Sequence, residues 1–141
     1  MNKFLIGIFA SLLLVACGKQ QKTANDNATA ETTSQAQYLD VDAATFKQMM
    51  SSKPGIVLDV RTPREFAGGK IAQAVNIDIT QPNFVSKVQK LDTKRPVYVY
   101  CHVGSRSSFA MKQMQNLGFT NVYNLQGGMS AWRNAGFPVQ N

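Results

Sequence analysis

The stretch that decides the fold is residues 97–108, VYVYCHVGSRSS. Its first four residues are β-branched or aromatic, which predicts a buried strand, and from Ser107 apolar residues recur at helical spacing until Gly118. The short loop between these two segments begins with Cys101. A strand that leads through such a loop into a helix can form an anion pocket, because loop N–H groups and the helix N-terminus add partial positive charge there. We therefore expect Cys101 to be an exposed, readily ionised nucleophile surrounded by amides.

The segments around this stretch alternate between strand and helix patterns. Strands are expected at 38–41, 56–60, 74–77, 97–100 and 121–125, and helices at 43–50, 63–67, 84–91, 107–117 and 129–135. Two helix starts carry capping signals: Asp42 before the first helix, and Thr62 with Glu65 as a capping box for the second. This alternation predicts an α/β domain with a mainly parallel, five-stranded sheet and helices on both faces.

Ligands in sheets of this kind bind at the carboxyl ends of the strands. Cys101 follows one predicted strand directly, and Asp59 and Arg61 stand at the end of another. We therefore expect these residues at one edge of the sheet.

The first 36 residues have a different character from the rest of the chain. Residues 1–16 contain one charge, Lys3, followed by an apolar run that is too short to span a membrane, which is typical of a secretory signal peptide. The run ends LVAC, which resembles a bacterial lipobox, so Cys17 is expected to become the lipidated N-terminus of the mature chain. An ordinary cleaved signal with an incidental cysteine is the alternative. Residues 17–36 have almost no apolar side chain other than alanine and are expected to form a flexible tether.

This reading places the protein in the cell envelope of a bacterium. The lipid on Cys17 would anchor it to a membrane, facing the periplasm, and Gly18 after the cysteine favours the outer membrane. Residues 37–141 are long enough for one domain with its own core. The basic residues are scattered rather than clustered, so nucleic acid is not an expected partner, and the net charge of +7 fits small anions or lipid headgroups.

The cysteine count narrows the chemistry further. If Cys17 carries lipid, Cys101 is the only remaining thiol and has no partner for a disulfide. A single histidine, His102, next to a single cysteine does not make a zinc site, so no metal or cofactor is expected.

Three stretches together resemble the single-domain rhodaneses. They are residues 58–77 (LDVRTPREFAGGKIAQAVNI), the cysteine loop 101–107 (CHVGSRS) and residues 121–138 (NVYNLQGGMSAWRNAGFP). Two positions depart from the family pattern. Lys70 stands where histidine is common, and Gln73 stands where glycine is common, which bears on the turn before the third strand.

The resemblance implies a sulfurtransferase, and we expect the protein to be a monomer. Cys101 would take the outer sulfur of thiosulfate or a similar donor as a persulfide and pass it to cyanide or a thiol. The backbone N–H groups of the loop would cradle this sulfur; they belong to His102, Val103, Gly104, Ser105 and Arg106. Arg106, with Arg61 beside it, would hold the anionic part of the donor, while Asp59 and Ser107 would support the loop.

Two other interpretations stay open. Cysteine phosphatases of the same fold use a Cys-x5-Arg loop, whereas this loop is Cys-x4-Arg, and a smaller loop favours a single sulfur atom over phosphate. A non-catalytic module that binds sulfur or senses redox state is the other alternative, against which the complete cysteine loop argues.

Overall fold

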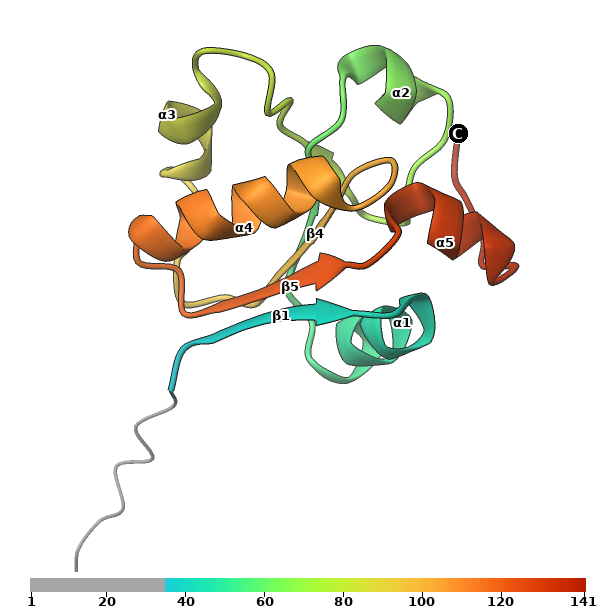
Figure 1. Ribbon diagram of the computed structural model, residues 1–141, viewed down its shortest axis with the longest axis horizontal. Helices are drawn as coiled ribbons and strands as arrows, with labels where there is room; N and C mark the ends of the chain where they lie inside the picture. Colours follow the sequence, from blue (N-terminus) through green and yellow to red (C-terminus); the bar gives the residue numbers. More distant parts are fainter. Residues whose placement is uncertain (1–34) are drawn as a thin grey trace, which may run out of the picture. The chain divides into compact units, whose positions relative to one another are not determined.

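The computed structural model describes residues 35–141. These residues form a five-stranded, all-parallel sheet with the strand order β1-β5-β4-β2-β3 (Figure 1). The strands are β1 (Gln37–Val41), β2 (Ile56–Asp59), β3 (Val75–Asn76), β4 (Val97–Tyr100) and β5 (Asn121–Leu125). The helices are α1 (Ala43–Ser52), α2 (Pro63–Ala67), α3 (Phe84–Val88), α4 (Ser105–Asn116) and α5 (Gly128–Asn134). The predicted α/β class and five-stranded parallel sheet are confirmed.

Helices cover both faces of the sheet, and side chains of β4 alternate between the two resulting core layers. Val97 and Val99 pack with residues of α3 and α4 on one face. Tyr98 and Tyr100 pack with residues of α1 and α5 on the other face. All four side chains of β4 are fully buried, which is expected of a central strand in a parallel sheet. β4 is therefore the most enclosed strand, and the loop that follows it starts from a rigid base.

Both predicted helix caps are present. The Asp42 carboxylate accepts a hydrogen bond of 2.9 Å from the N–H of Thr45 at the start of α1. At the start of α2, the Thr62 hydroxyl accepts from the N–H of Glu65, and the Glu65 carboxylate accepts from the N–H of Thr62. This reciprocal arrangement fixes the Glu65 side chain at the first turn of α2.

Several element boundaries differ from the sequence-based expectation. The helix expected from residue 107 begins at Ser105, because Gly104 adopts a left-handed conformation (φ 97°) and starts the helix two residues earlier. The helix expected over 84–91 ends at Val88, and the chain continues in tight turns in which Lys90 and Leu91 donate to carbonyls three residues back. The third strand is reduced to two residues, Val75 and Asn76.

The turn before β3 contains the glutamine that departs from the family pattern. Gln73 has a φ of 62°, in the left-handed region that glycine adopts most easily. The backbone therefore keeps the conformation suited to glycine, although the side chain is a glutamine.

Residues 1–34 lie outside the described part of the chain. The predicted signal peptide (1–16), the proposed lipidation site Cys17 and nearly all of the tether (17–36) fall there. Within residues 35–141, no helix combines the length and apolar character that a membrane span requires.

Candidate active site

Cys101 follows β4 directly and lies at the carboxyl edge of the sheet. The N–H of Gly104 donates a hydrogen bond of 3.1 Å to its Sγ atom, so the loop folds back over the sulfur. The residue has no solvent-exposed surface, which corrects the expectation of an exposed thiolate. The physical reason is that the loop is short enough for its own backbone to cover the side chain that it surrounds. Cys101 is the only free cysteine among the residues described.

The surroundings of Cys101 favour its ionised form. Burial is the largest influence and opposes ionisation, but hydrogen bonds from the Ser107 hydroxyl and from the N–H groups of Ser107, Gly104 and Val103 outweigh it. Together they lower the pKa of the Cys101 thiol below its ordinary value. The start of α4 adds partial positive charge at the same point. The site can therefore hold a sulfur anion without a separate base.

Ser107 has two possible acceptors for its single hydroxyl proton. Its Oγ atom lies 3.1 Å from the carbonyl oxygen of Gly104, and the same hydroxyl acts on the Cys101 sulfur. The geometry therefore allows this hydroxyl to donate either to the Gly104 carbonyl or to the Cys101 sulfur.

Two glycines allow the loop to approach its neighbours closely. A Cβ atom on Gly104 would lie 3.1 Å from the backbone nitrogen of Gly127. A Cβ atom on Gly128 would lie 2.4 Å from the carbonyl oxygen of Cys101, a distance that no real side chain tolerates. The β5–α5 connection thus presses against the cysteine loop, and only glycine fits at the point of contact.

The same connection holds the cysteine loop through backbone hydrogen bonds. Met129 N–H donates to the carbonyl of Cys101 at 2.8 Å, and Ser130 N–H donates to the carbonyl of His102 at 3.1 Å. This supporting role of α5 was missed by the sequence analysis, where the Gly-Gly pair served only as part of a family pattern. The signal that pointed to it is the pair itself at a strand-to-helix junction, where close backbone approach requires glycine.

Arg61 does not join Arg106 as the sequence analysis expected. Its Nη2 atom lies 2.6 Å from Oδ2 of Asp59 and 2.8 Å from the carbonyl oxygen of Gly69, and its side chain is 3% exposed. The guanidinium also lies over the ring of Tyr100. A buried arginine with these partners supports the end of β2, and it is not positioned to meet a donor from solution. The Asp59 carboxylate accepts hydrogen bonds from the N–H and the guanidinium of Arg61, whereas its expected support of the cysteine loop stays a prediction.

Arg106 lies on the first turn of α4 and pairs with a residue that the sequence analysis did not include in the site. Its Nη2 atom lies 2.6 Å from Oε1 of Glu65, and its Nη1 atom lies 2.9 Å from Oε2, a two-point contact. Both side chains are 31% exposed. Glu65 was recognised only for its cap, and nothing in the sequence links it to a residue 41 positions away.

The other residues of the cysteine loop lie mostly at the surface. His102, Val103 and Ser105 are exposed, and the Val103 side chain is 57% exposed despite being apolar. Of the predicted N–H donors at 102–106, those of Val103 and Gly104 act on the sulfur, and the N–H of Ser107, just beyond that range, acts on it as well. Among residues 35–141, no cluster of side chains suited to a metal ion occurs.

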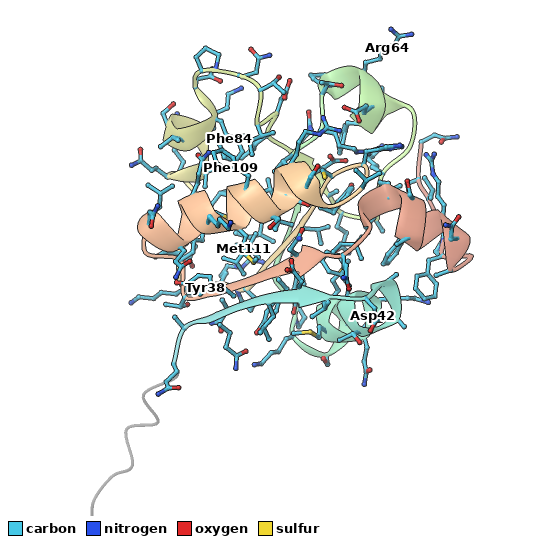
Figure 2. All side chains as sticks on the ribbon, in the orientation of Figure 1. Tyr38, Asp42, Arg64, Phe84, Phe109 and Met111 are labelled. Carbon is cyan, nitrogen blue, oxygen red and sulfur yellow. The ribbon has the colours of Figure 1, made fainter. Side chains whose placement is uncertain are left out.

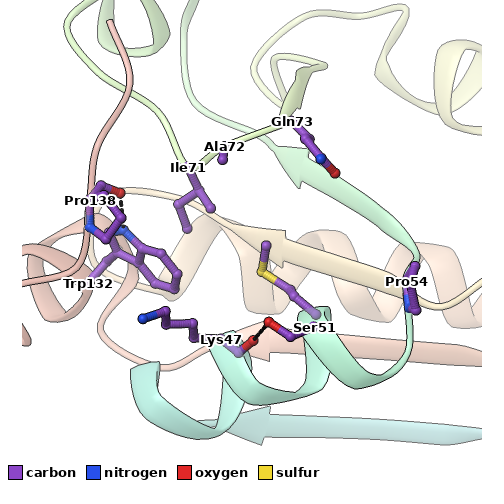
Figure 3. A pocket seen from close by; sticks show the side chains of 9 residues that line it. Lys47, Ser51, Pro54, Ile71, Ala72, Gln73, Trp132 and Pro138 are labelled. Carbon is purple, nitrogen blue, oxygen red and sulfur yellow. Dashed lines mark hydrogen bonds between the residues drawn. The ribbon is translucent and has the colours of Figure 1, made fainter.

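A separate pocket of about 460 Å³ lies on the other side of the domain from α4, and Cys101 is not among its lining residues (Figure 3). It is bordered by Lys47 and Met50 of α1, by the strained Gln73, and by Trp132 of α5. The pocket is mostly apolar, and neither Glu65 nor any residue of the cysteine loop lines it.

Comparison with known proteins identifies the family. The rhodanese-like domain family matches residues 42–135. The thiosulfate sulfurtransferase GlpE of Vibrio cholerae is 33% identical over 104 residues, covering 73% of this chain and 93% of the relative. A sulfurtransferase of Allochromatium vinosum is 32% identical over 102 residues, covering 71% and 92%.

Solved structures agree with this result. A rhodanese-related protein from Thermoplasma volcanium is 32% identical, has a TM-score of 0.65 and aligns over 73% of this chain and 98% of its own. The rhodanese-like domain of an Anabaena protein is 28% identical, with a TM-score of 0.65 over 74% and 80%. The matched residues include the strands β2 to β5, the cysteine loop and the β5–α5 connection that holds this loop. The chain belongs to the rhodanese-like domain family of sulfurtransferases.

Proposed function

We propose that this protein transfers a sulfane sulfur from thiosulfate or a similar donor to cyanide or a thiol, through a persulfide on Cys101. The observation that carries the proposal is the contact of 3.1 Å between the Gly104 N–H and the Cys101 sulfur, at the start of α4. Hydrogen-bond donors that stabilise the Cys101 thiolate also stabilise the persulfide anion that replaces it, because the negative charge stays within the same loop.

The transfer runs in two displacement steps. The Cys101 thiolate attacks the outer sulfur of the donor, the new bond joins Sγ to that sulfur, and the donor's S–S bond breaks with its electron pair leaving on sulfite or on a thiolate. The acceptor then attacks the outer sulfur of the persulfide and restores the Cys101 thiolate. Neither step needs an added base, because the hydrogen bonds of the loop lower the pKa of Cys101.

Arg106 is a cation on which the charge of Cys101 acts. It lies five residues after Cys101, on the first turn of α4, and its charge interacts with that of the cysteine. We assign it the role of holding the anionic part of the donor while sulfite or thiolate departs. Arg61, paired with Asp59, is not assigned this role.

The proposal is tested by measuring the intact mass of the protein after treatment with thiosulfate. We expect a gain of one sulfur atom that is lost on addition of cyanide and does not occur in Cys101→Ser. Ser107→Ala serves as a second variant, because it keeps the nucleophile but weakens its surroundings. An unchanged mass together with rapid hydrolysis of an aryl phosphate would contradict the proposal and favour the cysteine phosphatase alternative.

We also propose that the protein is a bacterial lipoprotein, anchored through Cys17 and facing the periplasm, with the outer membrane favoured. The support is the LVAC sequence after a short apolar run. The test is expression in a bacterium with an alkyne-labelled fatty acid, followed by separation of inner and outer membranes. We expect labelled protein in the outer membrane fraction and loss of both label and membrane association in Cys17→Ala. Label-free protein in the soluble periplasmic fraction would contradict this proposal.

A further inference from the structure

The charge environment of Arg106 is unusual for a residue that should bind an anion. The Glu65 carboxylate already contacts both terminal nitrogens of its guanidinium, at 2.6 and 2.9 Å. Oε2 of Glu65 is itself fixed by hydrogen bonds from the N–H and the hydroxyl of Thr62. The carboxylate is therefore held in place from α2 and does not depend on Arg106 for its orientation.

Glu65 remains ionised under all ordinary conditions. Hydrogen bonds from Arg106 are the main cause, and with those from Thr62 they outweigh burial and lower the pKa of Glu65 to about 2. The negative charge beside Arg106 is therefore permanent at any pH at which the enzyme would work.

A second carboxylate acts on the same guanidinium. Burial opposes ionisation of Asp78, but hydrogen bonds from Thr80 and Gln81, together with the charge of Arg106, lower the pKa of Asp78. Asp78 follows β3 and is 6% exposed, so its charge is poorly screened by solvent.

The charge of Glu65 also acts on Arg61, but Arg61 is already paired with another carboxylate. The Arg61 guanidinium is buried against Asp59. Arg64, next to Glu65, extends away from α2 and from the domain (Figure 2). Arg106 thus faces Glu65, Asp78 and the Cys101 thiolate with a single positive charge, and a donor must enter against this excess of negative charge.

We propose that Glu65 determines donor specificity: its charge disfavours doubly charged donors such as thiosulfate relative to singly charged persulfides. This inference rests on the proposed sulfurtransferase activity and narrows its donor class. In the thiosulfate reaction, a dianion and a thiolate meet, and a persulfide anion and sulfite leave, so three negative charges pass through the transition state. With a persulfide of a neutral thiol, the thiolate attacks the outer sulfur of a monoanion and releases one thiolate. Only two negative charges are then present in the transition state, so repulsion by the Glu65 carboxylate slows this reaction less.

Glu65→Gln in the full chain separates these effects. Glutamine keeps the capping box, because its amide oxygen can replace the carboxylate at this helix position, and it removes one negative charge. We expect kcat/KM for thiosulfate to rise about tenfold, and kcat/KM for the persulfide of 2-mercaptoethanol to change by less than about twofold. Sulfur transfer to cyanide is measured for both donors at equal ionic strength.

Two further variants complete the test. Asp92→Asn makes the same change in net charge at an exposed site before β4, at the opposite edge of the sheet, and should leave both donors unaffected. Glu65→Asp keeps the charge and should keep the low rate with thiosulfate. A ratio of thiosulfate to persulfide activity that does not change in Glu65→Gln would overturn the inference and leave the proposed function intact. If neither thiosulfate nor the persulfide places sulfur on Cys101, both this inference and the proposed function are wrong.

Discussion

Ser107 shows how a single hydroxyl can adjust the chemistry of the site. The Gly104 carbonyl that it contacts also accepts a hydrogen bond from the Ser108 N–H, so it does not depend on the Ser107 hydroxyl. The Cys101 thiolate depends on it more, because this hydroxyl is the strongest of the groups that lower the pKa of Cys101. Hydrogen bonds to charged groups are worth more than those to neutral ones.

Ser107→Ala is therefore expected to raise the pKa of Cys101 with little effect on the fold. The rate of sulfur loading at neutral pH should fall about tenfold, because less of the thiol is ionised. The acid limb of the pH–rate profile should move to higher pH, which thiolate absorbance during a pH titration would check. Ser108→Ala is the matched control, and an unchanged acid limb in Ser107→Ala would contradict the assigned role.

Glu65 gives a prediction for stability in acid. Its pKa is lowered from 4.5 to about 2, first by hydrogen bonds from Arg106, so the folded protein binds this proton less readily than the unfolded chain. The stabilisation is therefore fully present above pH 4.5 and is lost as pH falls towards 2. Because the pair is partly solvated, we expect wild type to exceed Glu65→Gln by about 1 kcal/mol at neutral pH. Urea denaturation as a function of pH measures this difference, which should disappear in acid.

At the scale of elements, the junction between β5 and α5 determines where the cysteine loop lies. Gly128→Ala is expected to displace this junction, because its Cβ atom would lie 2.4 Å from the carbonyl oxygen of Cys101. We expect a loss of about 3 kcal/mol in the free energy of unfolding and a larger proportional loss of sulfur loading.

Gly136→Ala is the control for this change. Gly136 also has a positive φ, of 71°, but an added Cβ atom would meet nothing within 4 Å. Both variants carry backbone strain, and only Gly128→Ala carries the clash. Equal losses in urea denaturation would show that the contact with the cysteine loop has no special importance.

The elements also show what sequence can predict. The bounds of β4 and β5 were predicted correctly, because buried runs of β-branched and aromatic residues end in clear turn and loop residues. The capping box placed the start of α2 for a similarly local reason. The cysteine loop and the residues that lower the pKa of Cys101 followed from one continuous stretch. Local patterns therefore predicted the elements and the position of Cys101 at the end of a strand.

Contacts between distant segments were not predictable in the same way. Arg61 and Arg106 were expected together because both follow strands, but Asp59 lies two residues from Arg61 and captures its guanidinium. Glu65 meets Arg106 only because α2 and α4 begin at the same edge of the sheet, a fact of the three-dimensional arrangement. The burial of the Cys101 side chain likewise depends on how closely the backbone of the loop folds over it.

At the scale of the whole molecule, residues 35–141 contain a complete core. Both apolar layers of the sheet are closed by helices of this segment, and β1 takes its place beside β5 with the register Gln37↔Asn121. We expect a chain beginning at Gln35 to fold alone and to show the same kcat/KM for sulfur transfer as the full chain in detergent. Thermal unfolding followed by circular dichroism, with activity measured alongside, checks this. A truncated chain without a cooperative transition would show that residues 1–34 contribute to the fold.

The parallel direction of all five strands has a practical consequence for attaching the protein to a support. Gln37 opens β1 at the amino edge of the sheet, whereas Cys101 follows β4 at the carboxyl edge, about 16 Å further along the strand direction. Gln140, the residue before the C-terminal Asn141, instead pairs with Lys70, close to the end of α2 and hence to Glu65. Immobilisation through the N-terminus should leave the carboxyl edge around Cys101 open to substrates in the bulk solution, whereas a bulky C-terminal fusion would crowd the neighbourhood of Glu65.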